Sequence, residues 1–285
     1  MERHTGEETG GAAQGRMDLH THSACSDGDR RPAELVRCAL AAGVSLLALT
    51  DHDSVSGVPE AVAAGHACGV TVVPGVEMDN EFDQELHILG LCVDPDNAPL
   101  RVELEAAHAR RIARNARIVQ NLMGVGVDVT PYLVPSGGVA TRLHIALALV
   151  RGGYADSVAD AFARYLRRGA PGYASLTRPS PARVIALLRG AGGIPVLAHP
   201  CHLKGNVHAI VAELCALGLG GIEAYYTTST AGQTQLFLSL AAQYGLMVTC
   251  GSDFHGDHRP ASRLGCAWTP DPTLERTRAA LLARL

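Results

Sequence analysis

Long hydrophobic runs are absent from this sequence, although 47% of its 285 residues are hydrophobic. No apolar stretch approaches the roughly 20 residues that a bilayer-spanning helix requires, so we expect no membrane partner. Residues 1–16 are polar and glycine-rich and lack the apolar core of a signal peptide. They are interpreted as a disordered leader or as a remnant of expression, and the protein is expected in the cytoplasm.

Positive charge is not in excess either. The chain has 24 lysines and arginines against 28 aspartates and glutamates, which gives a net charge of -4 at pH 7. No global basic field therefore attracts nucleic acid, and the binding of any polyanion must be local.

The cysteines contain no CxxC pair, although there are eight of them. The spacing typical of a zinc ribbon is therefore missing. Four cysteines fall among apolar residues of predicted helices and strands: Cys38, Cys68, Cys215 and Cys250. They are interpreted as small buried thiols in a reducing cytoplasm. Cys25 and Cys201 lie near the candidate metal ligands, but oxygen and nitrogen ligands suffice without them.

The chain does contain two histidines, two residues apart, at the end of a strand-like run at residues 17–22. Residues i and i+2 of a strand point to the same face, so His20 and His22 would project side by side. Two neighbouring imidazoles suit zinc, iron, nickel or copper. Alone, the pattern is more typical of ordinary polar loop residues, so its interpretation as a metal site depends on the rest of the chain.

Later strand-like runs end in, or carry, the same kinds of side chain. Residues 247–255, for example, end in a second i, i+2 pair, an aspartate and a histidine. The full set of candidate metal ligands is His20, His22, Asp27, His52, Glu77, His87, His199, Asp253 and His255. These exceed the three or four protein ligands of one zinc ion. They suit a cluster of two or three divalent ions, which we expect to be manganese, zinc or iron.

Strand and helix patterns alternate over most of the chain, which favours parallel strands with crossover helices. Strands are predicted at residues 17–22, 45–50, 71–76, 85–93, 194–198, 221–226 and 247–251. Helices are predicted at residues 32–42, 55–68, 181–189, 207–217, 233–244 and 272–285. We therefore expect an α/β fold, a distorted TIM-like barrel with seven strands. Active sites of such barrels lie at the C-terminal ends of the strands, where most candidate ligands fall.

The alternation stops between the fourth and fifth strands. Helical patterns at residues 101–123, 141–150 and 157–167 follow one another without a strong strand between them. We expect a helical insertion domain at residues 99–168, inserted into a barrel made of residues 17–98 and 169–285. The arginines from Arg110 to Arg117 are interpreted as a solvated helix face, with contact to a nucleic-acid backbone as the alternative.

The order of these short motifs resembles that of the PHP (polymerase and histidinol phosphatase) family. The motifs are His20-Thr21-His22, Thr50-Asp51-His52, Gly75-Val76-Glu77, the His87 strand, Ala198-His199-Pro200 and Ser252-Asp253-Phe254-His255. The resemblance covers about residues 17–267. It implies a distorted (βα)7 barrel and a metal-dependent phosphoesterase.

The resemblance also implies how the ligands divide among the metal ions. One ion would use His20, His22, Glu77 and Asp253, a second would use Glu77, His87 and His199, and a third would use Asp27, His52 and His255. A hydroxide that bridges the metals would attack phosphorus, with no covalent enzyme intermediate. Asp253 would be the catalytic residue that accepts a proton from the attacking water.

The insertion narrows the resemblance to family members that act on nucleotides. Residues 141–146, 161–166 and 172–173 resemble those of nucleoside 3',5'-bisphosphate phosphatases and of exonucleases that trim 5'-phosphorylated RNA. By that resemblance, Arg142 and His144 would hold a substrate phosphate, which guanidinium groups grip in a bidentate manner. The two residues do not share a helix face, so they converge only if Arg142 lies at or before the helix cap.

The expected partner is therefore a small phosphorylated nucleotide or a short 5'-phosphorylated oligonucleotide, with no obligate protein partner. Histidinol phosphate is an alternative substrate, against which the large insertion counts. A metal-binding module without catalysis is another alternative, against which the nearly complete ligand set counts. His202 and Lys204 are interpreted as contacts to a phosphate or base, or as exposed side chains. Four further histidines are expected at the surface, away from the site: His66, His108, His208 and His258.

Overall fold

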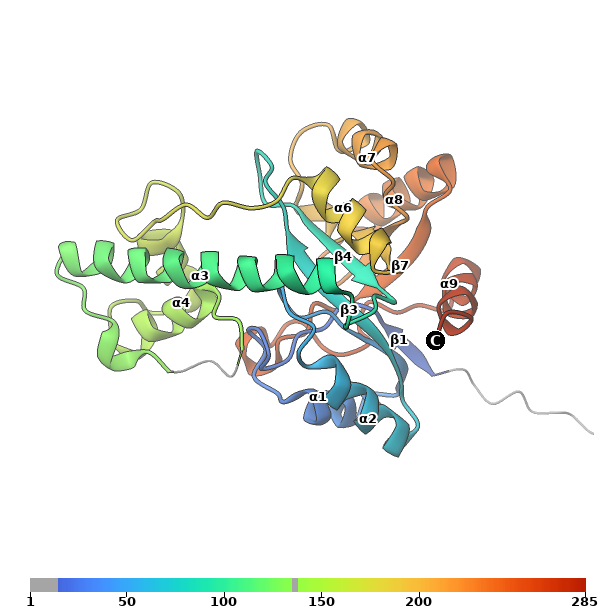
Figure 1. The fold of residues 1–285 in the computed structure, drawn as a ribbon, viewed down its shortest axis with the longest axis horizontal. Coiled ribbons are helices and arrows are strands. Elements are labelled where there is room, and N and C mark those ends of the chain that lie inside the picture. Colours follow the sequence, from blue (N-terminus) through green and yellow to red (C-terminus); the bar gives the residue numbers. More distant parts are fainter. Residues whose placement is uncertain (1–14, 135–137) are drawn as a thin grey trace, which may run out of the picture.

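The structure is a computed structural model that describes residues 15–134 and 138–285 (Figure 1). Most of the predicted leader, residues 1–14, lies outside the described residues. The first strand begins at Arg16, one residue earlier than predicted, and pairs there with Val44 of the second strand.

Within the described residues, the strands form one seven-stranded sheet in which they follow their order in the chain. They are β1 (Arg16–Asp18), β2 (Val44–Leu49), β3 (Thr71–Asp79), β4 (His87–Leu91), β5 (Ile194–Leu197), β6 (Gly221–Tyr226) and β7 (Met247–Gly251). The chain that follows β1 meets the end of β7, because the backbone N–H of Leu19 donates to the backbone oxygen of Cys250 and that of His22 to the backbone oxygen of Phe254, both at 2.9 Å. These bonds close the sheet, which confirms the predicted distorted barrel of seven strands.

Strand β4 runs opposite to the predicted direction. It is antiparallel to both β3 and β5, whereas the other neighbouring strands are parallel. The reason is the short connection at residues 80–86, since a parallel pair needs a crossover of a dozen or more residues. Because of the reversal, His87 at the start of β4 pairs with Asp79 at the end of β3. His87 therefore reaches the same rim of the barrel as the ends of the parallel strands.

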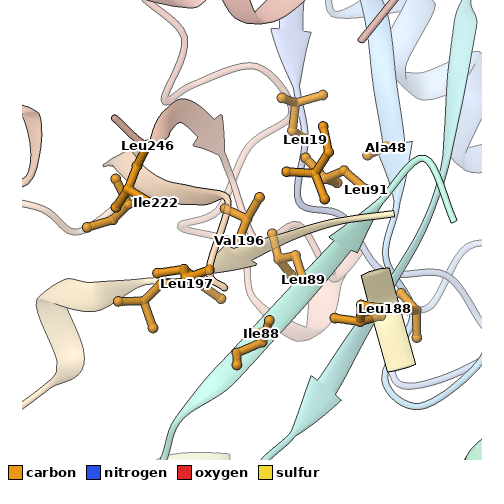
Figure 2. Packing of buried hydrophobic residues seen from close by; sticks show 14 of the residues in the cluster. Leu19, Ala48, Ile88, Leu89, Leu91, Leu188, Val196, Leu197, Ile222 and Leu246 are labelled. Carbon is orange, nitrogen blue, oxygen red and sulfur yellow. The ribbon is translucent and has the colours of Figure 1, made fainter. Parts of the chain in front are cut away.

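Helices cover the outside of the barrel (Figure 1). They are α1 (Pro32–Ala41), α2 (Val58–Cys68), α6 (Pro181–Gly190), α7 (Val207–Ala216), α8 (Ala231–Tyr244) and α9 (Pro272–Leu282). Figure 2 shows part of the core beneath them. Leu89 of β4 and Val196 of β5 lie side by side on one face of the sheet, and Ile222 of β6 lies on the other face, which α6 covers with Leu188. Among the described helices, none is long and apolar enough to cross a membrane.

A single long helix, α3 (Ala98–Gly124), runs from the barrel into a smaller lobe (Figure 1). Asn97 caps its first turn by accepting the backbone N–H of Leu100 at 3.1 Å, a start signal that the sequence analysis did not identify. The apolar side chains of this helix pack against two partners in turn, since Leu104 lies in the barrel core and Leu122 in the core of the lobe.

The lobe is built on the outer half of α3. Its other elements are η1 (Thr130–Tyr132), α4 (Arg142–Arg151), α5 (Val158–Ala161) and the π-helical turn η2 (Phe162–Leu166). Ile118 and Leu122 of α3 pack against Ile145 and Leu149 of α4 in a hydrophobic cluster separate from the barrel core. The lobe therefore has its own apolar interior, and α3 connects it to the barrel.

Candidate metal centre and active site

All the candidate metal ligands are buried and lie together at one rim of the barrel. Their ligand atoms form four groups, within each of which the atoms lie within 4.8 Å of one another. The groups are His22, Asp27, His52 and His255; His20, His22 and Asp253; His20, Glu77 and His199; and His52, Glu77 and His87. Strands far apart in the sequence thus deliver one continuous cluster of imidazoles and carboxylates.

Glu77, near the end of β3, lies at the centre of this cluster. Its Oε1 atom is 2.9 Å from Nδ1 of His87 and 3.1 Å from Nε2 of His199. Its Oε2 atom is 3.0 Å from Nδ1 of His52 and 3.3 Å from Nε2 of His22. A carboxylate whose two oxygens face different sets of imidazoles is positioned to bridge two cations.

Several polar atoms in the cluster lack a hydrogen-bond partner among the described residues. They are Nε2 of His20, Nε2 of His22, Oδ1 of Asp27, Nδ1 of His52 and Nε2 of His255. Leaving a buried polar atom unpaired costs about 1–3 kcal/mol, so such atoms normally have a partner. Nitrogen and oxygen atoms that converge without partners match the donor set of zinc, manganese or iron. The residues present therefore fit divalent metal ions.

The carboxylates of the cluster are held in their ionised form. Burial alone would raise the pKa of Glu77, but the imidazoles of His52 and His87 outweigh it and hold this pKa well below its usual range. The pKa values of Asp27 and Asp253 are lowered in the same way, against the effect of burial. Burial lowers the pKa of His52 to about 4, so this imidazole is neutral at pH 7, the form that binds a metal ion.

Asp253 is held in place by two residues that the sequence analysis missed. The hydroxyl of Tyr226 donates to its Oδ2 atom at 2.8 Å, and Nη1 of Arg259 donates to the same oxygen. Its Oδ1 atom remains turned toward the cluster, 3.3 Å from Nε2 of His22. The backbone of Asp253 adopts a φ of 54°, as His199 adopts 29°. Such left-handed conformations are strained for residues other than glycine and are typical of functional sites.

Glu223 on β6 supports two of the ligands and was also missed. Its Oε1 atom lies 3.1 Å from Nδ1 of His20, and its Oε2 atom accepts the backbone N–H of His199 at 2.7 Å. A carboxylate on one ring nitrogen fixes the tautomer and aims the other nitrogen at the metal. The sequence feature that could have identified Glu223 is that it is a single charged residue within the otherwise apolar run at residues 221–226.

Asp51 organises the loop that carries Asp27. Its carboxylate accepts the hydroxyls of Ser23 and Ser26, each at 2.6 Å, and the backbone N–H of Ser23 at 2.8 Å. This residue stands directly before a candidate ligand, His52, so its position in the motif was visible in the sequence but its structural role was not.

A cavity of about 470 Å³ lies between the metal-ligand rim and the lobe. His52 and His87 line it from the barrel, and Phe162 lines it from the lobe. Arginines from both parts of the chain line it as well: Arg111, Arg114, Arg142, Arg167, Arg168, Arg178 and Arg259. Guanidinium groups are suited to phosphate, so this cavity fits a polyanionic substrate.

The two predicted phosphate-binding residues lie at the start of α4. Arg142 is its first residue and lines the cavity, with its guanidinium 5.6 Å from the ring centre of Phe162. Nδ1 of His144 accepts the backbone N–H of Thr141 at 3.1 Å as part of the helix cap. The hydroxyl of Thr141 donates to Oδ2 of Asp27 at 2.9 Å, which joins this helix start to the ligand cluster.

The interpretation of the α3 arginines as a solvated face is wrong for two of them. Arg111 and Arg114 are only 4% and 5% exposed. Nη2 of Arg111 lies 2.7 Å from Asp53 and 3.1 Å from Asp79, both buried carboxylates at the barrel rim. The charged pattern of α3 did not show which face packs on the barrel. Arg117 is exposed, as predicted.

His258 was expected to lie away from the site, and this prediction is wrong. Its Nδ1 atom is 3.0 Å from the backbone oxygen of Asp27, and it lines the cavity. His202 is exposed but its ring stacks on that of His199 at 5.1 Å between centres. Lys204 is exposed, and its backbone N–H donates to Gln84 at 2.6 Å. His66 and His208 are exposed and His108 is half-buried.

A barrel that gathers buried imidazoles and carboxylates beneath an arginine-lined cavity defines a metal-dependent hydrolase of phosphate esters. Comparison with known proteins agrees. The PHP domain family matches residues 18–126. A 5'-3' exoribonuclease from Haemophilus influenzae is 33% identical over 248 residues, which cover 84% of this chain and 90% of that protein. A 3',5'-nucleoside bisphosphate phosphatase from Chromobacterium violaceum is 32% identical over 84% of this chain and 87% of its own length.

The fold agrees as well. A solved structure from Bifidobacterium adolescentis, assigned as a metal-dependent phosphoesterase, superposes with a TM-score of 0.84 and 32% identity. The match covers 96% of this chain and 97% of that one. The chain belongs to the PHP family. It is a metal-dependent hydrolase that acts on phosphoric ester bonds.

Proposed function

We propose that this protein hydrolyses phosphate esters of nucleotides, either a nucleoside 3',5'-bisphosphate or a 5'-phosphorylated oligonucleotide. The observation that carries the proposal is the cavity in which Arg142 and Arg178 face the metal-ligand rim. Each of these substrates carries more than one phosphate group, so one phosphate can contact the arginines while another reaches the metal-ligand rim. The names of the Haemophilus influenzae and Chromobacterium violaceum relatives, similar over 84% of this chain, support the substrate class.

We propose that the rim holds two or three divalent ions, either manganese, zinc or iron, divided among the ligands as the family resemblance implies. The grouping of Asp27, His52 and His255 within 4.8 Å supports a site for the third ion. The central place of Glu77 supports its sharing between the first two. When bound, such ions activate a water molecule and neutralise charge that develops at phosphorus.

Asp253 is proposed as the catalytic residue that accepts a proton from the attacking water. Its lowered pKa keeps it ionised, and Tyr226 and Arg259 hold one of its oxygens so that the other faces the cluster. Because water is the nucleophile, no covalent enzyme intermediate forms.

Arg142 and His144 are proposed to hold a phosphate of the substrate. Arg142 lies on the cavity wall, which supports its part of this proposal. It is the first residue after the cap, Thr141, so the convergence with His144 that depended on the cap position gains no support from this geometry. The cap uses only Nδ1 of His144, which leaves Nε2 for a phosphate oxygen.

We also propose that residues 99–168 act as a cap domain on the barrel of residues 17–98 and 169–285. The separate hydrophobic cluster around Leu122 and Leu149 supports this division. The protein is proposed to work in the cytoplasm. The eight cysteines all fall in the described part of the chain and are free thiols, which suits a reducing compartment.

The test is the release of phosphate and nucleotide in the presence of manganese. Adenosine 3',5'-bisphosphate, a 5'-phosphorylated RNA oligomer and histidinol phosphate are compared side by side. Turnover of either nucleotide substrate is expected, and Asp253→Asn should abolish it while the circular dichroism spectrum is unchanged. Turnover of histidinol phosphate alone would reassign the substrate. Bound metal without any phosphate release would favour a metal-binding module.

A further inference from the structure

A second cavity, of about 540 Å³, lies beside the active-site cavity, between α3 and residues 173–177. These residues belong to the extended segment that returns the chain from the lobe to α6, and Figure 1 shows this segment running along α3. The polar residues that line this groove are Arg110, Arg114, Arg117, Asn121, Tyr173, Ser175 and Thr177. The groove thus combines guanidinium groups on one wall with hydroxyl groups on the other.

The arginines form a row along one face of α3. Arg110, Arg114 and Arg117 are spaced by four and three residues, so they lie on the same side of the helix. At 1.5 Å per residue, the row is about 10 Å long. Asn121 extends it by one turn and donates to the backbone oxygen of Tyr173 at 2.9 Å, which fixes the opposite wall.

Arg114 joins this groove to the active site, because it lines both cavities. It is 5% exposed, and its Nε atom donates to Asn115 at 2.8 Å. Its Nη2 atom has no hydrogen-bond partner among residues 15–134 and 138–285. The neighbouring Arg111, in contrast, pairs with two buried carboxylates. A buried guanidinium without an anion is unfavourable, so Arg114 fits an anionic group that a ligand brings.

The rest of the row adds positive charge beside this junction. Arg117 is exposed and forms no ion pair within the described part of the chain. Arg110 contacts Glu103 at 2.8 Å, so its charge is partly balanced. The groove is therefore most strongly positive from the active-site cavity outward past Arg117.

We propose that this groove binds a single-stranded oligonucleotide. It holds the part of the nucleic-acid strand that lies beyond the phosphodiester cleaved in the active-site cavity. The inference rests on the proposed nucleotide phosphoesterase function. Arg114 holds the backbone phosphate nearest the cleaved bond, and Arg117 holds the next one outward. Ser175 and Thr177 donate to phosphate oxygens, as hydroxyls commonly do at nucleic-acid backbones. Tyr173 supplies an aromatic side chain on which a base stacks.

This groove makes the enzyme sensitive to the length of its substrate. A mononucleotide fills only the active-site cavity, whereas an oligomer also gains the contacts along α3. Each backbone phosphate that an arginine neutralises changes the slope of log affinity against log salt concentration by about 0.7. The oligomer reaction should therefore depend on salt more steeply than the mononucleotide reaction.

The test compares Arg117→Glu with Arg101→Glu. Arg101 is an exposed arginine of the same helix whose charge reversal is identical, but it lies outside the groove and contacts Asp96. For a 5'-phosphorylated RNA oligomer, Arg117→Glu should raise KM about tenfold, the loss of one charge-assisted contact, and flatten the salt dependence. Turnover of adenosine 3',5'-bisphosphate should stay at the level of the unaltered protein. Ser175→Glu, on the opposite wall, should cause the same selective loss.

If Arg117→Glu loses activity equally on both substrates, or loses none on the oligomer, the groove does not bind the oligonucleotide. The proposed function would remain intact. If the unaltered protein turns over neither substrate, the proposed function fails by itself. In that case, the binding of a fluorescently labelled oligomer, measured by anisotropy, still tests whether the groove binds an oligonucleotide. Binding that is equally tight in Arg117→Glu and Arg101→Glu refutes it.

Discussion

Nδ1 of His20 and Oε1 of Glu223 lie 3.1 Å apart inside the barrel, although 203 residues separate them in the chain. Both side chains are fully buried. The same carboxylate accepts the backbone N–H of His199, so one residue of β6 positions ligands that belong to two proposed metal ions. Glu223 is not one of the proposed ligands, and we expect it to act through the residues that it holds.

Replacing Glu223 by glutamine should weaken metal binding. Loss of the negative charge lowers the basicity of His20 and loosens its orientation, and changes of this kind typically cost about 10–100-fold in metal affinity. Activity titrated with manganese should show that shift in the dissociation constant, with kcat nearly restored at saturating metal. Glu213→Gln, exposed on α7, is the matched control. An unaltered dissociation constant would mean that Glu223 serves packing alone.

Gly251 should not tolerate even alanine. A Cβ atom there would lie 2.1 Å from Oε1 of Glu223 and 2.3 Å from Cβ of His20. Overpacking of this kind costs about 1–3 kcal/mol, and it would also displace His20 from the cluster. Thermal unfolding temperature and metal content should both fall in Gly251→Ala. Gly232→Ala is the control, because an added Cβ meets none of the described atoms within 4 Å. Equal behaviour of the two variants would contradict the prediction.

The acid limb of the pH–rate profile should move when Arg259 is replaced by glutamine. Burial raises the pKa of Asp253, and Arg259 is the strongest of the charges that together lower it well below its usual value. A carboxylate with a lowered pKa works until the pH falls through that value. Without Arg259 the pKa rises, so kcat/KM should be lost at a higher pH than in the unaltered protein. Arg263→Gln, at an exposed position, should leave the profile in place.

Binding of metal ions at pH 7 should release protons. Burial lowers the pKa of His22, but Asp253 and Glu77 outweigh it and raise this pKa to about 9. The pKa values of His20 and His87 are also raised. These imidazoles carry protons at pH 7 in the metal-free protein, and a metal ion binds only the neutral ring. Calorimetric titrations in buffers of different ionisation enthalpy should therefore give different heats. Identical heats in every buffer would contradict this assignment.

The positions of the strands could be predicted because each is a short apolar run between turns. The direction of β4 could not be obtained from the alternation of elements, although the short connection after Asp79 carried that information. A barrel was predicted from the alternation of elements and the family resemblance, but the particular contacts that close it were not. Its closure depends on hydrogen bonds between Leu19 and Cys250, which no local pattern encodes.

The candidate ligands could be predicted because histidines and carboxylates recur at the ends of several apolar runs, and strand ends of a barrel converge on one rim. Their supporting residues depend on contacts between distant segments. Arg111 meets Asp53 across 58 residues, and a helix with charges on several faces does not reveal which of them is buried. The cap of α4 shows the same limit, since Thr141 was part of a motif but its bond to Asp27 spans 114 residues.

The junction between β1 and β7 links the proposed metal centre to the rate at which the barrel unfolds. His22 follows one side of this seam and Asp253 follows the other, with 3.3 Å between Nε2 and Oδ1. Contacts between chain segments this far apart form late in folding, because a long loop must be closed first. An ion held across this seam would have to dissociate before the barrel could open. Contacts absent from the folding transition state mainly slow unfolding, so we expect bound metal to lengthen the lifetime of the folded enzyme.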